Sequence, residues 1–155
     1  MLMAEKKSSK RFTVPAIITM TCVHDDDALS DSTDFELTTK GLFSRCDDKF
    51  SISYEDSEAT GFENSTTVIE VSGVKNASVR REGEAPSELV LEVEKKHHCH
   101  YGTPFGGLML GVYTKSIDNR LSDEGGKLEL RYVIDSNGSF VSENWISLSV
   151  EPETV

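Results

Sequence analysis

The chain contains about ten short segments in which apolar and polar residues alternate, and no helix-length apolar pattern separates them. The clearest covers residues 87–95, where Leu89, Leu91 and Val93 take alternate positions and charged residues take most of the others. Successive side chains of a β-strand point to opposite faces, so this pattern predicts strands with one wet and one buried face. A chain built of such strands must close into a barrel or pack as two sheets.

Short connections join these segments, which favours a meander of hairpins over long crossovers. Asn137 and Gly138 give the strongest hairpin signal. A meander of about eight to ten strands leaves two exposed edges unless it closes, so we expect an all-β, single antiparallel up-and-down barrel. The expected strands cover residues 12–22, 34–44, 50–54, 66–72, 77–82, 87–95, 97–103, 108–117, 127–135 and 140–151.

Residues outside these strands are expected to form a tail and loops. Residues 1–11 are polar, which predicts a disordered N-terminal tail before a barrel domain over residues 12–151. Residues 24–34 are interpreted as an acidic loop, and residues 118–126 as one helical turn or a loop. Pro15 interrupts the first strand, and because proline lacks a backbone N–H it would have to lie at a sheet edge or a bulge.

The net charge and the cysteines limit the expected partners and compartment. The 155 residues include 16 Lys and Arg against 27 Asp and Glu, a net charge of −11, which repels phosphate and argues against nucleic acid and membrane partners. Cys22, Cys46 and Cys99 are odd in number and widely spaced, and no apolar stretch follows the basic start. We therefore expect a cytoplasmic protein, monomer or homodimer, whose protein partners are unknown.

Five short motifs occur in order along the chain: ISYED at 52–56, REG at 81–83, YGTPFG at 101–106, TKSI at 114–117 and GKLELRY at 126–132. This ordered set resembles the YwiB-like family of small bacterial proteins, a domain of unknown function, and the resemblance extends over roughly residues 38–151. It implies a calycin-like β-barrel, the architecture of lipocalins and fatty-acid-binding proteins. It implies no activity, cofactor or catalytic residue. The acidic loop, the basic tail and the histidine cluster depart from the family.

The histidine cluster at residues 97–100 is the chemically richest stretch. On a strand, His97 and Cys99 share one face with Tyr101, while His98 and His100 share the other. His98 and His100 are weak candidates for a surface zinc or nickel site, which would need further ligands. The alternative, an edge strand with accidental histidines, is favoured because the spacing matches no known ligand pattern. We expect no metal and no cofactor.

Arg81 is the most suggestive candidate for a binding residue. It lies two residues after Val79 on the same expected strand, so its side chain should point to the same, inward face. With Tyr54, Tyr101 and Tyr132 it would form a ligand-binding set that receives the carboxylate of an otherwise apolar ligand. The favoured alternative is that Arg81 reaches the rim or pairs with an acid at the edge of the core, because small barrels are often filled by their own side chains.

These observations give three hypotheses of function. The first is a non-enzymatic barrel that holds a small apolar or amphipathic ligand in its interior. The second is a protein-interaction or scaffold module that uses a strand edge or the acidic surface. An enzyme comes third, because the sequence contains no nucleophile elbow, phosphate loop or other catalytic constellation.

Overall fold

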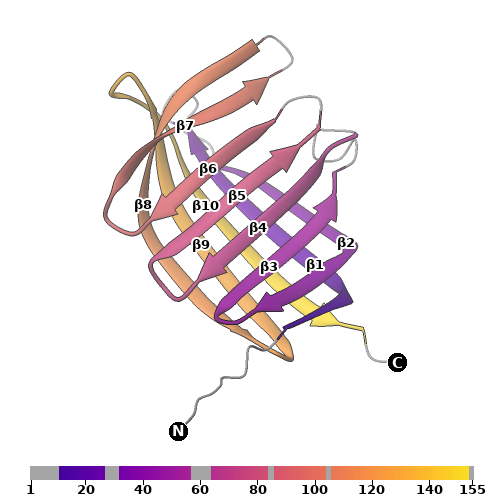
Figure 1. The fold of residues 1–155 in the computed structure, drawn as a ribbon. Coiled ribbons are helices and arrows are strands. Elements are labelled where there is room, and N and C mark those ends of the chain that lie inside the picture. The colour runs from indigo at the N-terminus through magenta and orange to yellow at the C-terminus, as the bar shows by residue number, and fades with distance from the viewer. Residues whose placement is uncertain (1–10, 27–31, 57–63, 84–85, 104–105, 154–155) are drawn as a thin grey trace, which may run out of the picture.

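The computed structural model describes residues 11–26, 32–56, 64–83, 86–103 and 106–153, and these form ten strands that close into a barrel (Figure 1). Strands adjacent in sequence are adjacent in the sheet, and β1 pairs with β10 to complete the ring. This confirms the predicted all-β, antiparallel up-and-down barrel. The strands are β1 (Arg11–Asp26), β2 (Ser32–Cys46), β3 (Lys49–Glu55), β4 (Thr66–Ser72), β5 (Asn76–Glu82), β6 (Ser87–Glu92), β7 (Lys96–Thr103), β8 (Gly106–Ser122), β9 (Gly125–Ser136) and β10 (Ser139–Pro152).

The alternation in the sequence determines which side chains form the interior. Leu89 and Leu91 on β6 are buried, whereas Val90 between them is exposed. The same alternation of burial recurs along β3 and β4. The barrel wall thus presents apolar side chains inward and polar ones outward, as a one-sided sheet must. The described residues contain no helix long and apolar enough to cross a membrane.

One end of the barrel is filled by its own side chains. Phe43 is fully buried, and its ring contacts Phe12 edge-on at 5.6 Å and stacks on Phe50 at 5.5 Å between centroids. Arg45 lies 5.2 Å from the Phe50 ring centre and forms an ion pair with Asp123 in the turn between β8 and β9. Because β2 and this turn are not neighbours in the ring, the ion pair links two non-adjacent parts of the barrel at this end.

Two of the expected loops are shorter than predicted. The acidic loop expected at residues 24–34 is wrong at both ends, since β1 continues to Asp26 and β2 begins at Ser32. The helical turn or loop expected at residues 118–126 is also wrong at both ends, because β8 continues to Ser122 and β9 begins at Gly125, which leaves a turn of residues 123–124. A bulge between Thr114 and Ser116 shifts the inward positions from even to odd numbers, which disrupts the alternation along β8. Residues 1–10 of the expected tail lie outside the described residues, and β1 begins at Arg11.

Pro15 lies inside β1, at a place where the sheet tolerates it. Its carbonyl oxygen accepts a hydrogen bond from the backbone N–H of Glu153 at 3.0 Å, while the register of β1 with β10 starts one residue later, at Ala16. The N–H and C=O of a residue in an antiparallel strand point to the same neighbour. The missing N–H of Pro15 therefore faces the end of β10, where the ladder stops.

The neighbours β6 and β7 are joined differently from the other strands. A single register pair connects them, where the next shortest ladders contain six. Side chains bridge the remainder: the backbone N–H of Val90 donates to Sγ of Cys99 at 3.3 Å, and Nε2 of His97 lies 2.9 Å from Oε1 of Glu92. This seam is the part of the described wall with the fewest backbone hydrogen bonds between neighbours.

Candidate functional site

The barrel contains a cavity of about 640 Å³ towards the end opposite the phenylalanine cluster. Its lining includes the later part of β1, with Met20 and Cys22, whereas Phe12 at the start of β1 belongs to the filled end. Likewise Tyr54 near the end of β3 lines the cavity, and Phe50 near its beginning does not. A volume of roughly 300–1,000 Å³ is typical of sites for small molecules.

The cavity exists because the inward residues change character along the strands. On β4 the inward Val71 gives way to Thr67, and on β10 the inward Leu148 gives way to Asn144 and then Ser142. Asn144 and Ser142 fill less space than Leu148, whereas Thr67 is close to valine in shape and adds polarity to the wall without adding room. The same strands therefore make a packed core at one end and a hollow at the other.

Arg81 lines this cavity and forms an ion pair with a buried acid. Its Nε lies 3.8 Å from Oδ2 of Asp56, and the two side chains are 17% and 1% exposed. The Thr67 hydroxyl donates a hydrogen bond of 2.6 Å to the same Asp56 oxygen. Both features expected as alternatives are present, because Arg81 faces the interior and also pairs with an acid at the edge of the core.

The three expected tyrosines lie around the same cavity. Tyr54 and Tyr132 are buried and Tyr101 is half-buried. The Tyr54 hydroxyl lies 3.3 Å from the sulfur of Met20. Burial raises the pKa of Tyr54 and of Tyr132 far above the ordinary range, with nearby Asp56 also raising that of Tyr54. Both phenols therefore stay protonated at neutral pH and act as hydrogen-bonding groups.

A second group of polar side chains faces the cavity from β1 and β10. The amide of Asn144 donates to the Ser142 hydroxyl at 3.0 Å, and both residues are buried. The thiol of Cys22 lines the cavity too, and burial raises its pKa. A raised pKa suppresses the nucleophilic thiolate, so this thiol has the character of a lining group.

Sequence reasoning missed the polar residues that support the expected set. Asp56 comes two positions after Tyr54, so continuing the alternation past the expected end of the strand would have placed it inward. Ser142 and Asn144 precede Ile146 and Leu148 with the same two-residue spacing. Their small polar side chains carried no signal by themselves, since such residues are common in strands and turns.

The histidine cluster does not belong to the cavity. His98 and His100 are exposed on the outer face, and Cys99 is buried on the inner one, as the alternation predicted. The ring of His100 packs against Gly107, where a Cβ atom would lie 2.5 Å from the ring. Within the described residues no three or more His, Cys, Asp or Glu side chains form a group that could hold a metal ion.

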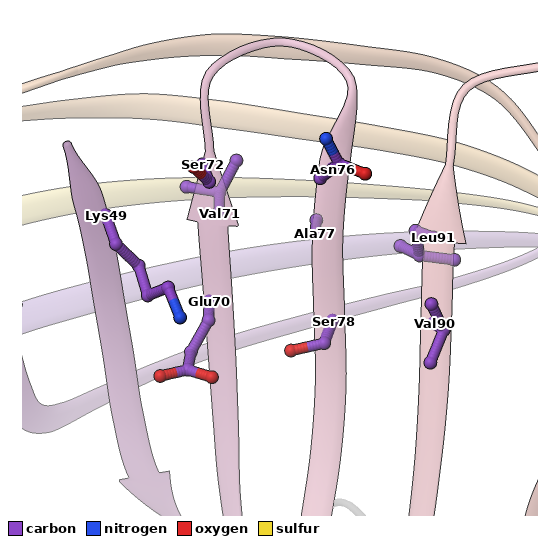
Figure 2. Close-up of a pocket in the computed structure, with 9 residues that line it drawn as sticks. All are labelled: Lys49, Glu70, Val71, Ser72, Asn76, Ala77, Ser78, Val90 and Leu91. Atoms are coloured by element: carbon purple, nitrogen blue, oxygen red, sulfur yellow. The ribbon is translucent and has the colours of Figure 1, made fainter.

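A second hollow of about 370 Å³ lies along β3 to β6 near the turn between β4 and β5 (Figure 2). Figure 2 shows the Lys49 side chain extending towards Glu70, and Glu70 also lies 3.8 Å from Arg80. Lys49 is exposed and Glu70 half-exposed, an arrangement typical of the outer face of a sheet. The interior cavity is therefore the candidate functional site.

Comparisons with known proteins agree with the fold and add no activity. The sequence profile of a domain of unknown function, DUF1934, matches residues 18–148. The crystal structure of the YwiB protein from Bacillus subtilis is similar, with a TM-score of 0.79 and 22% sequence identity over 92% of this chain and 94% of that one. No curated protein matches at a significant level. The chain thus belongs to the DUF1934 family of domains of unknown function.

Proposed function

We propose that this protein is a non-enzymatic binder of a small amphipathic ligand, which the interior cavity encloses. The observation that carries the proposal is the cavity itself: about 640 Å³ of space, lined mainly by apolar side chains and by a few convergent polar ones around Arg81. Cavities with this balance are typical small-molecule sites, because apolar walls supply affinity and a few polar groups fix the orientation.

The polar groups of the cavity suit binding better than catalysis. The half-buried thiol of Cys22 and the buried phenols of Tyr54 and Tyr132 have raised pKa values, which keeps them in their unreactive protonated forms. A nucleophile requires the opposite, a lowered pKa or an adjacent base. The described lining residues include no histidine to act as that base.

The uncharged fluorophore prodan tests the proposal, since its emission shifts to the blue and brightens in an apolar site. We expect saturable binding to the unmodified protein. Leu110→Trp, which adds bulk to the cavity lining, should weaken it at least about tenfold, because the ligand and the indole compete for one volume. Met109→Trp is the matched control, since Met109 is the residue before Leu110, points outward and is 64% exposed.

Two results would count against an enclosed ligand. One is the absence of saturable prodan binding to the folded protein at high micromolar concentration. The other is equal loss of binding in Leu110→Trp and Met109→Trp, which would place the probe on the outer surface.

One observation favours the alternative, a protein-interaction module. Closure of the barrel pairs the strand edges, but residues 106–110 of β8 precede its first register pair with β9, at Gly111. Leu108 and Met109 in that stretch are 53% and 64% exposed. An apolar strand edge can pair with another chain. If it does, Met109→Lys should abolish an association that light scattering detects in the unmodified protein and should leave prodan binding intact.

A further inference from the structure

The charge balance around Arg81 restricts the class of ligand that the cavity can hold, and this step rests on the proposed function. Arg81 is the single charged side chain among the described residues that line the cavity. Asp56 lies behind it, 1% exposed and absent from the lining, with its Oδ2 3.8 Å from Arg81 Nε. The carboxylate therefore compensates the guanidinium charge before any ligand is bound.

This arrangement disfavours a charged head group of either sign. A ligand carboxylate at Arg81 would place two negative charges beside one cation, and like charges that share a site disfavour each other's ionisation. A ligand ammonium would instead face the guanidinium directly. The expectation of a bound carboxylate treated Arg81 as an uncompensated cation, and the position of Asp56 removes that premise.

A ligand with an uncharged polar head avoids both the repulsion by the Asp56 carboxylate and the repulsion by the Arg81 guanidinium. Such a head needs partners that both donate and accept hydrogen bonds, because a buried polar group without a partner is costly. The cavity provides them in the guanidinium of Arg81, the buried phenol of Tyr132 and the hydroxyl of Ser87. The remaining lining residues are mostly apolar and match a hydrocarbon body.

We propose that the cavity selects ligands with an apolar body and an uncharged hydrogen-bonding head, such as an amide or a primary alcohol, over carboxylates of the same chain length, because Asp56 neutralises Arg81. Isothermal titration calorimetry with decanamide, decanoate and decyltrimethylammonium tests this at pH 7.5. The three probes share one chain length and differ in the charge of the head. Decanamide should bind about tenfold more tightly than either ion.

A pair of variants tests the role assigned to Asp56. Asp56→Asn removes the carboxylate that pairs with Arg81, so decanoate should gain about tenfold in affinity while decanamide changes little. Glu55→Gln is the matched control, because Glu55 is the preceding residue of β3, is exposed and carries the same charge. It should leave the order of the three probes unchanged.

A measurement on the unmodified protein covers the case in which Asp56→Asn fails to fold. Carboxylic acids titrate near pH 4–5, so lowering the pH from about 7.5 to about 5 converts much decanoate to its uncharged form. Its apparent affinity should rise over that range, and the described lining residues include no histidine to confuse the titration.

The outcomes separate the two proposals. Decanoate that binds the unmodified protein as tightly as decanamide, or an affinity that stays flat with pH, overturns the selectivity while the enclosed-ligand function stands. Failure of all three probes and of prodan to bind overturns both. A gain for decanoate that is equal in Asp56→Asn and Glu55→Gln would assign the preference to net charge and not to the cavity.

Discussion

The ion pair between Arg81 and Asp56 should stabilise the folded barrel measurably, and its magnitude follows from the geometry. Two unit charges 3.8 Å apart attract by about 4 kcal/mol at an effective dielectric constant near 20, which is an upper bound. Arg81 is 17% exposed and borders a cavity, so water can solvate its guanidinium when Asp56 is replaced. This solvation reduces the expected loss of stability. We expect Asp56→Asn to lower the free energy of unfolding by about 2 kcal/mol.

The partner variant should cost more. Arg81→Met deprives Asp56, 1% exposed, of the guanidinium and leaves it the hydroxyl of Thr67, so we expect a loss of about 3 kcal/mol. The double variant should lose clearly less than the sum, with a coupling energy of about 2 kcal/mol.

Urea unfolding followed by tryptophan fluorescence and circular dichroism measures these energies in one double-mutant cycle. Glu55→Gln, which removes an exposed charge next to Asp56, is the control and should stay within about 0.5 kcal/mol of the unmodified protein. Losses for Asp56→Asn as small as those of the control, or single-variant losses that simply add, would refute the idea that the pair acts as a unit.

Three further predictions concern other parts of the barrel. Phe43→Ala, which empties the centre of the aromatic cluster, should lower the free energy of unfolding by about 3–5 kcal/mol in urea titrations. With Ellman's reagent at pH 8, exposed Cys46 should react quickly and Cys22 slowly, because burial raises the pKa of the Cys22 thiol; equal rates would contradict the cavity assignment. Lys96 lies 2.6 Å from Asp135 and holds the pKa of that carboxyl below its usual value, which stabilises the fold above pH 4 and is lost as the pH falls further. Lys96→Met should therefore flatten the fall in stability below pH 4.

Much of the barrel could be predicted from the sequence because strand periodicity is local. The alternation of apolar and polar residues around Leu89 and Leu91 predicts their inward direction from about five neighbouring residues, independently of the rest of the chain. The errors arose where that period was interrupted. The bulge in β8 changes the parity after Thr114, and the charged residues near Asp26 resemble a loop although they extend β1 and β2.

The candidate site was predictable in part. The two-residue alternation along the strands predicted inward side chains for Arg81, Tyr54 and Tyr132, and burial confirms this for both tyrosines. The partnership of Arg81 with Asp56 depends on the register of three strands, β3, β4 and β5, which no local pattern contains. Whether an interior is hollow depends on how all inward side chains fill one volume, and a sequence read strand by strand does not provide that sum.

The same ten strands form a packed aromatic cluster at one end of the barrel and a cavity at the other. Phe43 and its neighbours anchor the ring, so exchanges around Asn144 and Ser142 disturb few of the contacts that hold it together. The aromatic contacts of the filled end are therefore separate from the polar residues of β10 that line the cavity. Substitutions intended to change ligand specificity should therefore begin at the residues of β4 and β10 that line the cavity, because the aromatic cluster at the other end stays intact.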